Sequence, residues 1–307
     1  MKKILVIAGP TAVGKTSLSI SLAKALNGEI VSADSMQVYK SLDIGTAKPD
    51  IEERCGIIHH MLDVCEPSHR YSVAEYVKDA TTCIDDICSR GKLPIVVGGT
   101  GLYIDHLLFE TDFNEGNSDP SLRDELNRVA EEKGSAELKR ILAEFDPDTA
   151  IRLHDNDTKR IIRAIEFYRV TGKTITDHNK DNTFTKKRYD ADFFVLNCSD
   201  RNVLYDRINM RVDMMLRAGL VDEARRVCEA DWFSDSTAAQ AIGYKEFIPY
   251  FNNDKSLDDC VELLKQHSRN YAKRQLTWFR SKNDAVFLDI LSDIQPFETI
   301  TTLRKEK

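Results

Sequence analysis

The chain has 307 residues, of which 42% are hydrophobic and 30% charged, and its formal net charge is −7. These are the proportions of a globular chain that can bury a core, and no apolar run approaches the ~20 residues of a membrane span. The seven cysteines are scattered, odd in number and without a Cys-x-x-Cys pair, so they indicate neither a disulfide framework nor a zinc site. We therefore expect a cytoplasmic protein with reduced cysteines and no membrane partner.

The first predicted elements alternate between strand and helix. Apolar runs predict buried strands, and apolar residues in helical spacing predict amphipathic helices. The strands are expected at residues 4–8, 29–33 and 93–97, and the helices at 15–26 and 71–90. Strand, helix, strand, helix, strand is the pattern of a right-handed α/β unit.

The pattern changes at the polar, turn-rich segment 114–118. Residues 121–180 are helical in pattern, a strand returns at 193–197, and helices resume from 201 to 281 before a short last strand at 285–289. We predict an α/β fold: a P-loop NTPase-like parallel sheet flanked by helices. Residues 1–113 and 191–307 form this core with its C-terminal helices, and residues 114–190 form an all-helical insertion domain.

The segment between the first strand and the first helix fits the P-loop template, in which backbone N–H groups and a helix N-terminus surround a diphosphate. Lys15 supplies a point charge and Thr16 a hydroxyl for Mg²⁺. A P-loop ATPase or kinase also places an aspartate at the end of another buried strand. Here Val97 is followed by Gly98, Gly99 and Thr100, with no acid. The motif therefore indicates a diphosphate site but does not by itself indicate ATP hydrolysis.

Asp34 follows the second strand, at the sheet edge where α/β proteins bind ligands. An aspartate there can ligate magnesium, cap a helix or act as a base, and the residue types alone leave these roles open. Gln37 has the donor and acceptor that suit the N6/N7 edge of adenine. His59 and His60 are adjacent, so their side chains point apart and do not predict a metal site.

Two basic segments stand out against the acidic total. Residues 159–188 contain nine Lys or Arg and three acids, and residues 265–282 contain six Lys or Arg and no acid. Because screening limits the reach of each charge to roughly 8–10 Å, such segments can hold a polyanion locally. The alternative for each segment is a solvated helix face.

In collinear order over most of its length, the sequence resembles the bacterial tRNA dimethylallyltransferases (tRNA isopentenyltransferases). The matching segments are the P-loop and residues 34–39, 45–49, 59–63, 98–103, 153–157, 160–164, 240–246 and 271–280. The resemblance implies an enzyme that transfers a dimethylallyl group from dimethylallyl diphosphate to N6 of the tRNA adenosine next to the anticodon. At Asp155 the family usually has proline, and this departure affects the turn before a helix that is expected to bind tRNA.

The family's site residues transfer to this chain by position. The implied catalytic residues are Asp34 as the base, Thr100 and Arg211; the implied metal is Mg²⁺ at Thr16. The diphosphate-binding residues are Gly9, Pro10, Thr11, Ala12, Val13, Gly14, Lys15 and Thr16. The tRNA-binding residues are Asp34, Ser35, Met36, Gln37, Thr100, Arg123, Lys159, Arg160, Ile161, Ile162, Arg163, Gln240, Ala241, Ile242, Gly243, Tyr244, Lys245, Lys273, Arg274, Gln275, Leu276, Thr277, Trp278, Phe279 and Arg280.

Three other functions compete with this hypothesis. An adenylate dimethylallyltransferase, acting on AMP or ADP, shares the chemistry but needs no extended basic surface. A P-loop kinase of small molecules needs the strand-end aspartate that is missing after Val97. A non-catalytic RNA-binding module does not need Asp34 and Lys15 together. The expected partners are tRNA and dimethylallyl diphosphate, and the expected oligomeric state is a monomer.

Overall fold

In the computed structural model, which describes residues 1–110, 119–181, 186–292 and 295–305, the chain packs as two units. The core unit contains residues 1–109 and 187–307, and the helical unit contains residues 110–186. The domain boundaries expected from sequence lie four residues further along the chain at each junction. The polar segment 114–118 that suggested the first boundary lies outside the described residues.

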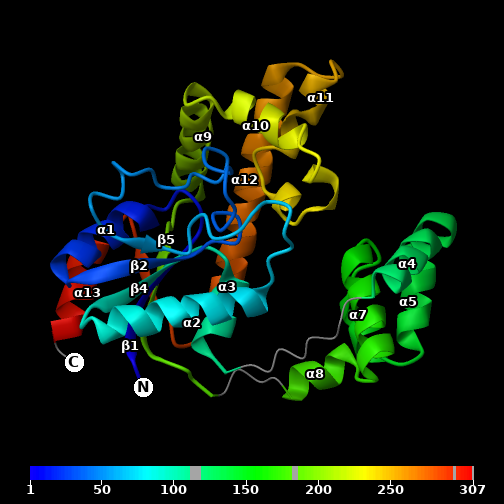
Figure 1. The fold of residues 1–307 in the computed structure, drawn as a ribbon, viewed down its shortest axis with the longest axis horizontal. Coiled ribbons are helices and arrows are strands. Elements are labelled where there is room, and N and C mark those ends of the chain that lie inside the picture. The colour runs from blue at the N-terminus through cyan, green and yellow to red at the C-terminus, as the bar shows by residue number, and fades with distance from the viewer. Residues whose placement is uncertain (111–118, 182–185, 293–294, 306–307) are drawn as a thin grey trace. The chain divides into compact units, whose positions relative to one another are not determined.

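The described part of the core unit is built on a six-stranded sheet in the order β3-β2-β4-β1-β5-β6, with every neighbouring pair parallel (Figure 1). The strands are β1 (Lys3–Ala8), β2 (Gly28–Ala33), β3 (His59–His60), β4 (Leu93–Gly98), β5 (Asp190–Asn197) and β6 (Val286–Asp289). The five strands predicted from apolar runs are confirmed. β3 was not predicted, because two residues are too short to display a strand period.

Helices cover both faces of this sheet. The chain steps from β1 through α1 to β2 in one direction, continues to the edge strand β3, and returns through α2 to β4 in the other direction. Right-handed crossovers therefore place α1 and α2 on opposite faces. The helices are α1 (Lys15–Ala25), α2 (Val73–Ser89), α3 (Gly101–Leu108), α9 (Arg201–Arg217), α10 (Leu220–Cys228), α11 (Ile248–Phe251), α12 (Leu257–Arg280) and α13 (Pro296–Lys305). Short 3₁₀ turns lie at η1 (Phe233–Asp235), η2 (Ala238–Gln240) and η3 (Lys245–Phe247).

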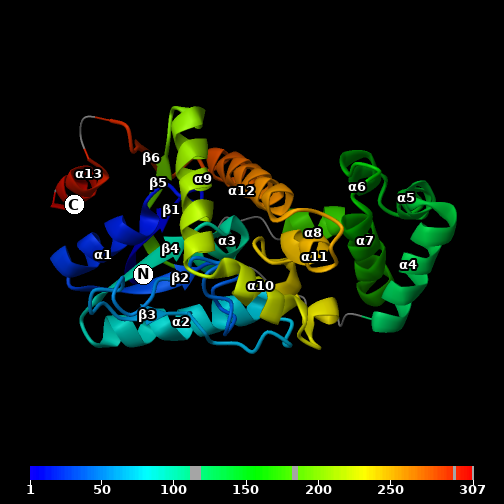
Figure 2. The same ribbon diagram turned by 90° about the horizontal axis from the view of Figure 1, so that it is seen from above.

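The main apolar core lies between the sheet and α1. Leu5, Ile95 and Leu196 on neighbouring strands pack against Leu22 of α1 and Ile300 of α13. A second cluster packs α9 against α12, through residues such as Ile208 and Leu276, beside the strand ends (Figure 2). These two clusters fix the positions of α1, α9 and α12, the helices that carry the site.

The helical unit has its own core. Its helices are α4 (Pro120–Lys133), α5 (Ser135–Ala143), α6 (Pro147–Arg152), α7 (Thr158–Thr171) and α8 (Ile175–Asp181). Leu126, Leu138 and Ile165 are buried together between them. The helical pattern predicted for residues 121–180 is confirmed, since the described part of this unit contains helices and no strand.

Because the sheet is parallel, the carboxyl ends of its strands share one edge. The P-loop leaves β1 there, Asp34 leaves β2, and Gly99 leaves β4. Three segments that are separated in the sequence thus meet at one place, where open α/β sheets bind their ligands.

Candidate active site

The P-loop turns sharply between β1 and α1. Gly9 and Gly14 have φ of +145° and +97°, values that side chains disfavour, and a Cβ on Gly9 would lie 2.6 Å from the Leu196 carbonyl oxygen. Lys15 opens α1, and its ammonium donates hydrogen bonds to the carbonyls of Gly9 (2.9 Å) and Pro10 (2.7 Å). The lysine is therefore held over the loop, where an entering anion would meet its charge.

Two side chains from distant helices hold the P-loop in place. Gln275 of α12 accepts a hydrogen bond from the Thr11 N–H (2.9 Å) and donates to the Gly99 carbonyl (3.0 Å). Arg207 of α9 donates from Nε to the Ala12 carbonyl (2.9 Å). Arg207 was not among the site residues predicted from the sequence, and Gln275 was predicted to contact tRNA. Arg207 lies four residues before Arg211 on the same helix, and this spacing was the signal in the sequence that could have identified it.

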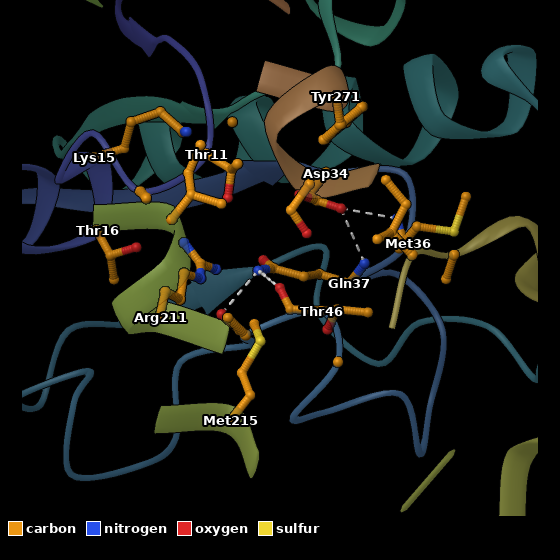
Figure 3. A pocket seen from close by; sticks show the side chains of 18 of the residues that line it. Thr11, Lys15, Thr16, Asp34, Met36, Gln37, Thr46, Arg211, Met215 and Tyr271 are labelled. Atoms are coloured by element: carbon orange, nitrogen blue, oxygen red, sulfur yellow. Dashed lines mark hydrogen bonds between the residues drawn. The ribbon is translucent and has the colours of Figure 1, made fainter. Parts of the chain in front are cut away.

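Asp34 forms a tight turn just beyond β2. Its Oδ1 accepts hydrogen bonds from the N–H groups of Met36 (2.9 Å) and Gln37 (3.3 Å). The second carboxylate oxygen points into the cavity (Figure 3). One oxygen thus fixes the rotamer, and the other is presented to a ligand.

Thr100 supports this turn from β4. Its Oγ1 accepts a hydrogen bond from the Ser35 N–H (3.0 Å) and donates to the Ser35 hydroxyl (3.3 Å), while its own N–H donates to the Ala33 carbonyl (3.1 Å). The Tyr271 hydroxyl lies beside Thr100, and burial raises the pKa of that phenol. Thr100 therefore joins the ends of β2 and β4 next to Asp34.

These groups surround a cavity of about 1160 Å³ in the core unit. Its walls come from the P-loop, the turn after β2, the loop at 45–49, α9, the 240–246 segment and α12. Figure 3 shows Thr11, Lys15, Thr16, Asp34, Gln37, Arg211 and Tyr271 facing one another across it. Seven of the predicted catalytic and diphosphate-binding residues line this cavity: Thr11, Ala12, Gly14, Lys15, Thr16, Asp34 and Arg211. Gly9, Pro10, Val13 and Thr100 lie behind the lining residues.

The electrostatics of the cavity favour an anion. Burial, together with the neighbouring Arg211 charge, lowers the pKa of Lys15 to about 7, against the opposing effect of Asp34. Burial also lowers the pKa of Arg211, while Asp34 and Glu53 act to raise it. Two cations that are destabilised by burial in this way gain from a bound diphosphate, which restores their preference for the charged form.

The side chain of Gln37 already forms hydrogen bonds within the protein. Its amide nitrogen donates to the carbonyls of Thr46 and Ala47 (3.2 Å each), and its Oε1 accepts from the Ser32 hydroxyl (3.2 Å). Gln37 still lines the cavity, but both of its N–H groups are engaged. A contact with adenine at this position would therefore use the remaining acceptor capacity of Oε1 or would displace the loop carbonyls.

The predicted RNA contacts in the core unit divide by burial. Ser35, Met36, Gln240, Ile242, Lys245, Arg274 and Gln275 line the cavity, and Lys273, Thr277, Trp278 and Arg280 are exposed on α12. Gly243, Tyr244, Leu276 and Phe279 are buried. The assignment of these four buried positions to the RNA surface stays a prediction. Ala241 is also buried but lines the cavity.

Trp278 combines an exposed ring with a fixed orientation. The side chain is 41% exposed, its Nε1 donates to Oδ2 of the buried Asp105 (2.9 Å), and Lys282 pairs with the same oxygen (2.6 Å). The ring lies against Gly101, where a Cβ would come within 2.2 Å of it. An aromatic ring held in this way among cations is the composition of a nucleic-acid stacking surface.

The predicted RNA contacts in the helical unit also include both exposed and buried residues. Lys159, Arg160 and Arg163 are exposed near the start of α7, whereas Ile161 and Ile162 are buried in the unit's core. The assignment of Ile161 and Ile162 to the RNA surface stays a prediction, and their side chains pack in the core of the unit. Arg123 is partly exposed and pairs with the buried Glu166 (2.6 Å).

Asp155, where the sequence departs from the family pattern, lies in the turn before α7. It forms an ion pair with Lys139 of α5 (2.6 Å). The turn itself closes through a hydrogen bond from the Asp157 N–H to the His154 carbonyl (2.9 Å). The helix start is thus formed with aspartate at this position.

This is a P-loop α/β protein in which the P-loop and the carboxylate of Asp34 face one cavity, and no acid directly follows β4. The chain belongs to the IPP transferase family, whose profile matches residues 37–282. A second profile, described as Isopentenyl transferase, matches residues 2–63. The predicted resemblance and the P-loop NTPase-like fold are confirmed.

Individual relatives agree with this assignment. The chain is 49% identical to the tRNA dimethylallyltransferase of Bacillus velezensis, over 94% of this chain and 90% of that one. Among solved structures, the tRNA delta(2)-isopentenylpyrophosphate transferase of Staphylococcus epidermidis is 42% identical, with a TM-score of 0.72 and 100% of both chains covered. A eukaryotic dimethylallyltransferase acting on tRNA is 34% identical, with a TM-score of 0.80, covering 99% of this chain and 78% of that one.

Within the described ranges, no helix combines the length and hydropathy that crossing a membrane requires.

Proposed function

We propose that this protein transfers the dimethylallyl group of dimethylallyl diphosphate to N6 of the adenosine adjacent to the anticodon in tRNA and releases diphosphate. One observation carries the proposal: the P-loop lysine and the Asp34 carboxylate face the same cavity, which is large enough for a prenyl diphosphate and an adenine together. The relatives named tRNA dimethylallyltransferase support the choice of substrates.

The acceptor half of the reaction needs a base. The exocyclic amine of adenine is a weak nucleophile because its lone pair is delocalised into the ring. As the bond between N6 and the prenyl C1 forms, the bond between C1 and the diphosphate oxygen breaks, and the amine loses a proton. The cavity-facing oxygen of Asp34 accepts this proton, while its Oδ1 stays bound to the backbone N–H groups of Met36 and Gln37.

The donor half needs stabilisation of negative charge. The allylic carbon delocalises its own developing positive charge, so the protein mainly stabilises the departing diphosphate. Lys15, Arg211 and the backbone N–H groups of the P-loop supply this stabilisation from one side of the cavity. The hydrogen bonds of Arg207 and Gln275 to the P-loop backbone hold the loop in position while negative charge develops on the diphosphate.

Magnesium fits this site through few protein ligands. The Thr16 hydroxyl is exposed at the N-terminus of α1 and lines the cavity. No group of three or more His, Cys, Asp or Glu side chains suited to a metal occurs in the described ranges. Mg²⁺ commonly keeps several waters and binds through substrate phosphates plus one or two protein oxygens, so a single hydroxyl is sufficient. Bound with the diphosphate, Mg²⁺ would neutralise part of the charge on the leaving oxygens.

The tRNA surface that we propose consists of exposed cations. In the core unit these are Lys273, Arg274 and Arg280 of α12, together with Trp278, and in the helical unit Lys159, Arg160 and Arg163. Phosphate contacts from such residues position an RNA, and the base is taken out of its stack at a cost of a few kcal/mol. We expect the enzyme to act as a monomer in the cytoplasm, where its tRNA substrate is found.

The decisive experiment mixes the protein with dimethylallyl diphosphate, Mg²⁺ and unmodified tRNA and measures the mass of the digested nucleosides. We expect one five-carbon unit on the adenosine next to the anticodon. Free AMP, tested in parallel, should remain essentially unmodified. Comparable turnover of AMP would reject tRNA as the substrate, and phosphoryl transfer from labelled ATP at an enzyme-like rate would reject the transferase assignment.

A further inference from the structure

A buried carboxylate outside the reacting groups holds one wall of the cavity. Glu223 of α10 is only 4% exposed. Its two oxygens accept hydrogen bonds from the consecutive N–H groups of Ile44 (3.0 Å) and Gly45 (2.9 Å), and Oε1 also accepts from the Tyr244 hydroxyl (2.9 Å). Hydrogen bonds to a buried charged group are among the stronger ones in proteins, and losing the acceptor leaves the donors unsatisfied.

Close packing around Gly45 joins this carboxylate to the 240–246 segment. The Tyr244 ring lies against Gly45 so closely that a Cβ there would come within 2.6 Å of the ring's Cζ. Gly243, with φ of +115°, approaches the Gly45 backbone in turn, and its Cβ would lie 3.2 Å from the Gly45 Cα. Two glycines far apart in the sequence thus bring their backbones together, and Glu223 connects both segments.

The loop that Glu223 holds continues directly to the reacting centre. The carbonyls of Thr46 and Ala47, just after Gly45, accept both hydrogen bonds from the Gln37 amide nitrogen. The Gln37 backbone N–H in turn donates to Oδ1 of Asp34. Gly45, Thr46, Ala47 and Gln37 all line the cavity, and Figure 3 shows the bonds between Gln37 and this loop.

We propose that Glu223 is a positioning residue for the acceptor side of the cavity. It acts through the loop at residues 43–47 and through Gln37, and it does not touch the reacting atoms. The inference rests on the proposed function, because it concerns how the adenine meets Asp34. The diphosphate side is held separately by Arg207 and Gln275, from α9 and α12. Disturbing Glu223 should therefore weaken use of the tRNA and leave the P-loop intact.

The test uses the full-length chain with three substitutions and one control. Glu223→Ala removes all three acceptor contacts, Glu223→Gln keeps one good acceptor oxygen, and Tyr244→Phe removes only the hydroxyl. The control is Glu229→Ala, at the exposed end of α10, where Glu229 pairs with Arg225 at 3.6 Å. For each variant we measure kcat, the KM for tRNA, the Kd for inorganic diphosphate with Mg²⁺, and Tm.

We expect Glu223→Ala to raise the KM for tRNA by about tenfold or more, with smaller increases for Glu223→Gln and Tyr244→Phe in that order. The Kd for diphosphate should stay within about twofold of the wild-type value, since the P-loop contacts are unchanged. The control should behave as wild type. If Glu223→Ala does not fold, the partial loss expected of Glu223→Gln and Tyr244→Phe decides the question.

Two results would overturn the inference while leaving the proposed function standing: unchanged tRNA kinetics in the folded Glu223 variants, or equal losses for tRNA and diphosphate, which would indicate a general structural role. A wild-type protein that does not prenylate tRNA would instead reject the proposed function, and this inference with it.

Discussion

At the scale of single residues, Asp34 and Lys15 are prepared by different surroundings. One oxygen of Asp34 is hydrogen-bonded within a turn, and the other faces the cavity. The carboxylate therefore needs no reorganisation when a substrate binds. Lys15 is stretched over the P-loop carbonyls, with a pKa lowered to about 7 mainly by burial. The Asp34 carboxylate is therefore positioned to accept a proton, and the charged form of Lys15 is stabilised when an anion binds.

Replacing Asp34 with asparagine tests the base. The amide oxygen of Asp34→Asn can still accept the two backbone hydrogen bonds, so the turn should survive while proton acceptance is lost. We expect kcat to fall by about 10²–10⁴-fold with tRNA affinity nearly unchanged. Single-turnover kinetics and a separate tRNA-binding measurement check this prediction. Wild-type activity in the variant would mean that another group takes the proton.

The lowered pKa of Lys15 predicts how donor binding depends on pH. A bound diphosphate favours the charged lysine, so the pKa of Lys15 is higher in the complex than the value of about 7 in the free protein. The stabilisation is then fully present below pH 7 and is lost as the pH rises above it, by up to about tenfold in affinity per pH unit.

Calorimetric titration with diphosphate between pH 6 and 9 measures this dependence. Lys15→Arg is the matched control, because arginine stays charged throughout the range and the ionisation of the ligand is the same for both proteins. We expect a steeper loss of affinity in the wild type than in the variant. Parallel curves would show that Lys15 does not titrate on binding.

At the scale of elements, α12 serves both substrates with different faces. Its inward face carries Gln275, which holds the P-loop, and Tyr271, which lies beside Thr100. Its outward face carries Lys273 and Arg280, whereas Arg274 is exposed but also lines the cavity. The helical period of 3.6 residues separates these faces, so one element connects the diphosphate site to the proposed RNA surface.

Removing the two outward charges tests that surface. In Lys273→Gln/Arg280→Gln we expect weaker tRNA binding and a smaller salt dependence, with the slope of log K against log[salt] reduced by about 0.7 per lost phosphate contact. The Kd for diphosphate should not change. Lys24→Gln, on the exposed last turn of α1, is the control. An unchanged salt slope in the double variant would exclude α12 from the RNA interface.

At the scale of the whole molecule, the net charge is −7, but cations are concentrated in two segments of the chain. Lys159, Arg160 and Arg163 are exposed near the start of α7, while the neighbouring isoleucines are buried. Because the helical unit has its own core, changes on its surface should not disturb the cavity of the core unit.

Reversing these charges tests whether the helical unit binds RNA. We expect Lys159→Glu/Arg160→Glu/Arg163→Glu to raise the KM for tRNA by at least about tenfold at physiological salt. Its Kd for diphosphate should match the wild type, which serves as the control for folding of the core unit. Wild-type tRNA kinetics would rule out a role for this surface.

Five of the six described strands, the P-loop, the helical nature of the insertion and the order of the motifs could be predicted from the sequence alone. These follow from local physics: buried parallel strands require apolar runs, a phosphate loop requires glycine at positions of positive φ, and helices show their period over a few turns. For that reason β1, β2 and β4 were placed within one residue of their observed ends. The helices α3 and α13 were not predicted, because α3 follows a glycine run and α13 is short.

The sequence did not show which side chains of each motif face outward, or which contacts hold the walls of the cavity; both became known from the folded structure. Tyr244, Gln275 and Ile161 are buried, although Lys245, Arg274 and Arg160 beside them in the sequence are exposed. The hydrogen bonds of Gln275 to Thr11, and of Glu223 to Ile44 and Gly45, join residues that the sequence does not relate. Such contacts depend on how helices pack across the sheet edge, and no local period or propensity encodes them.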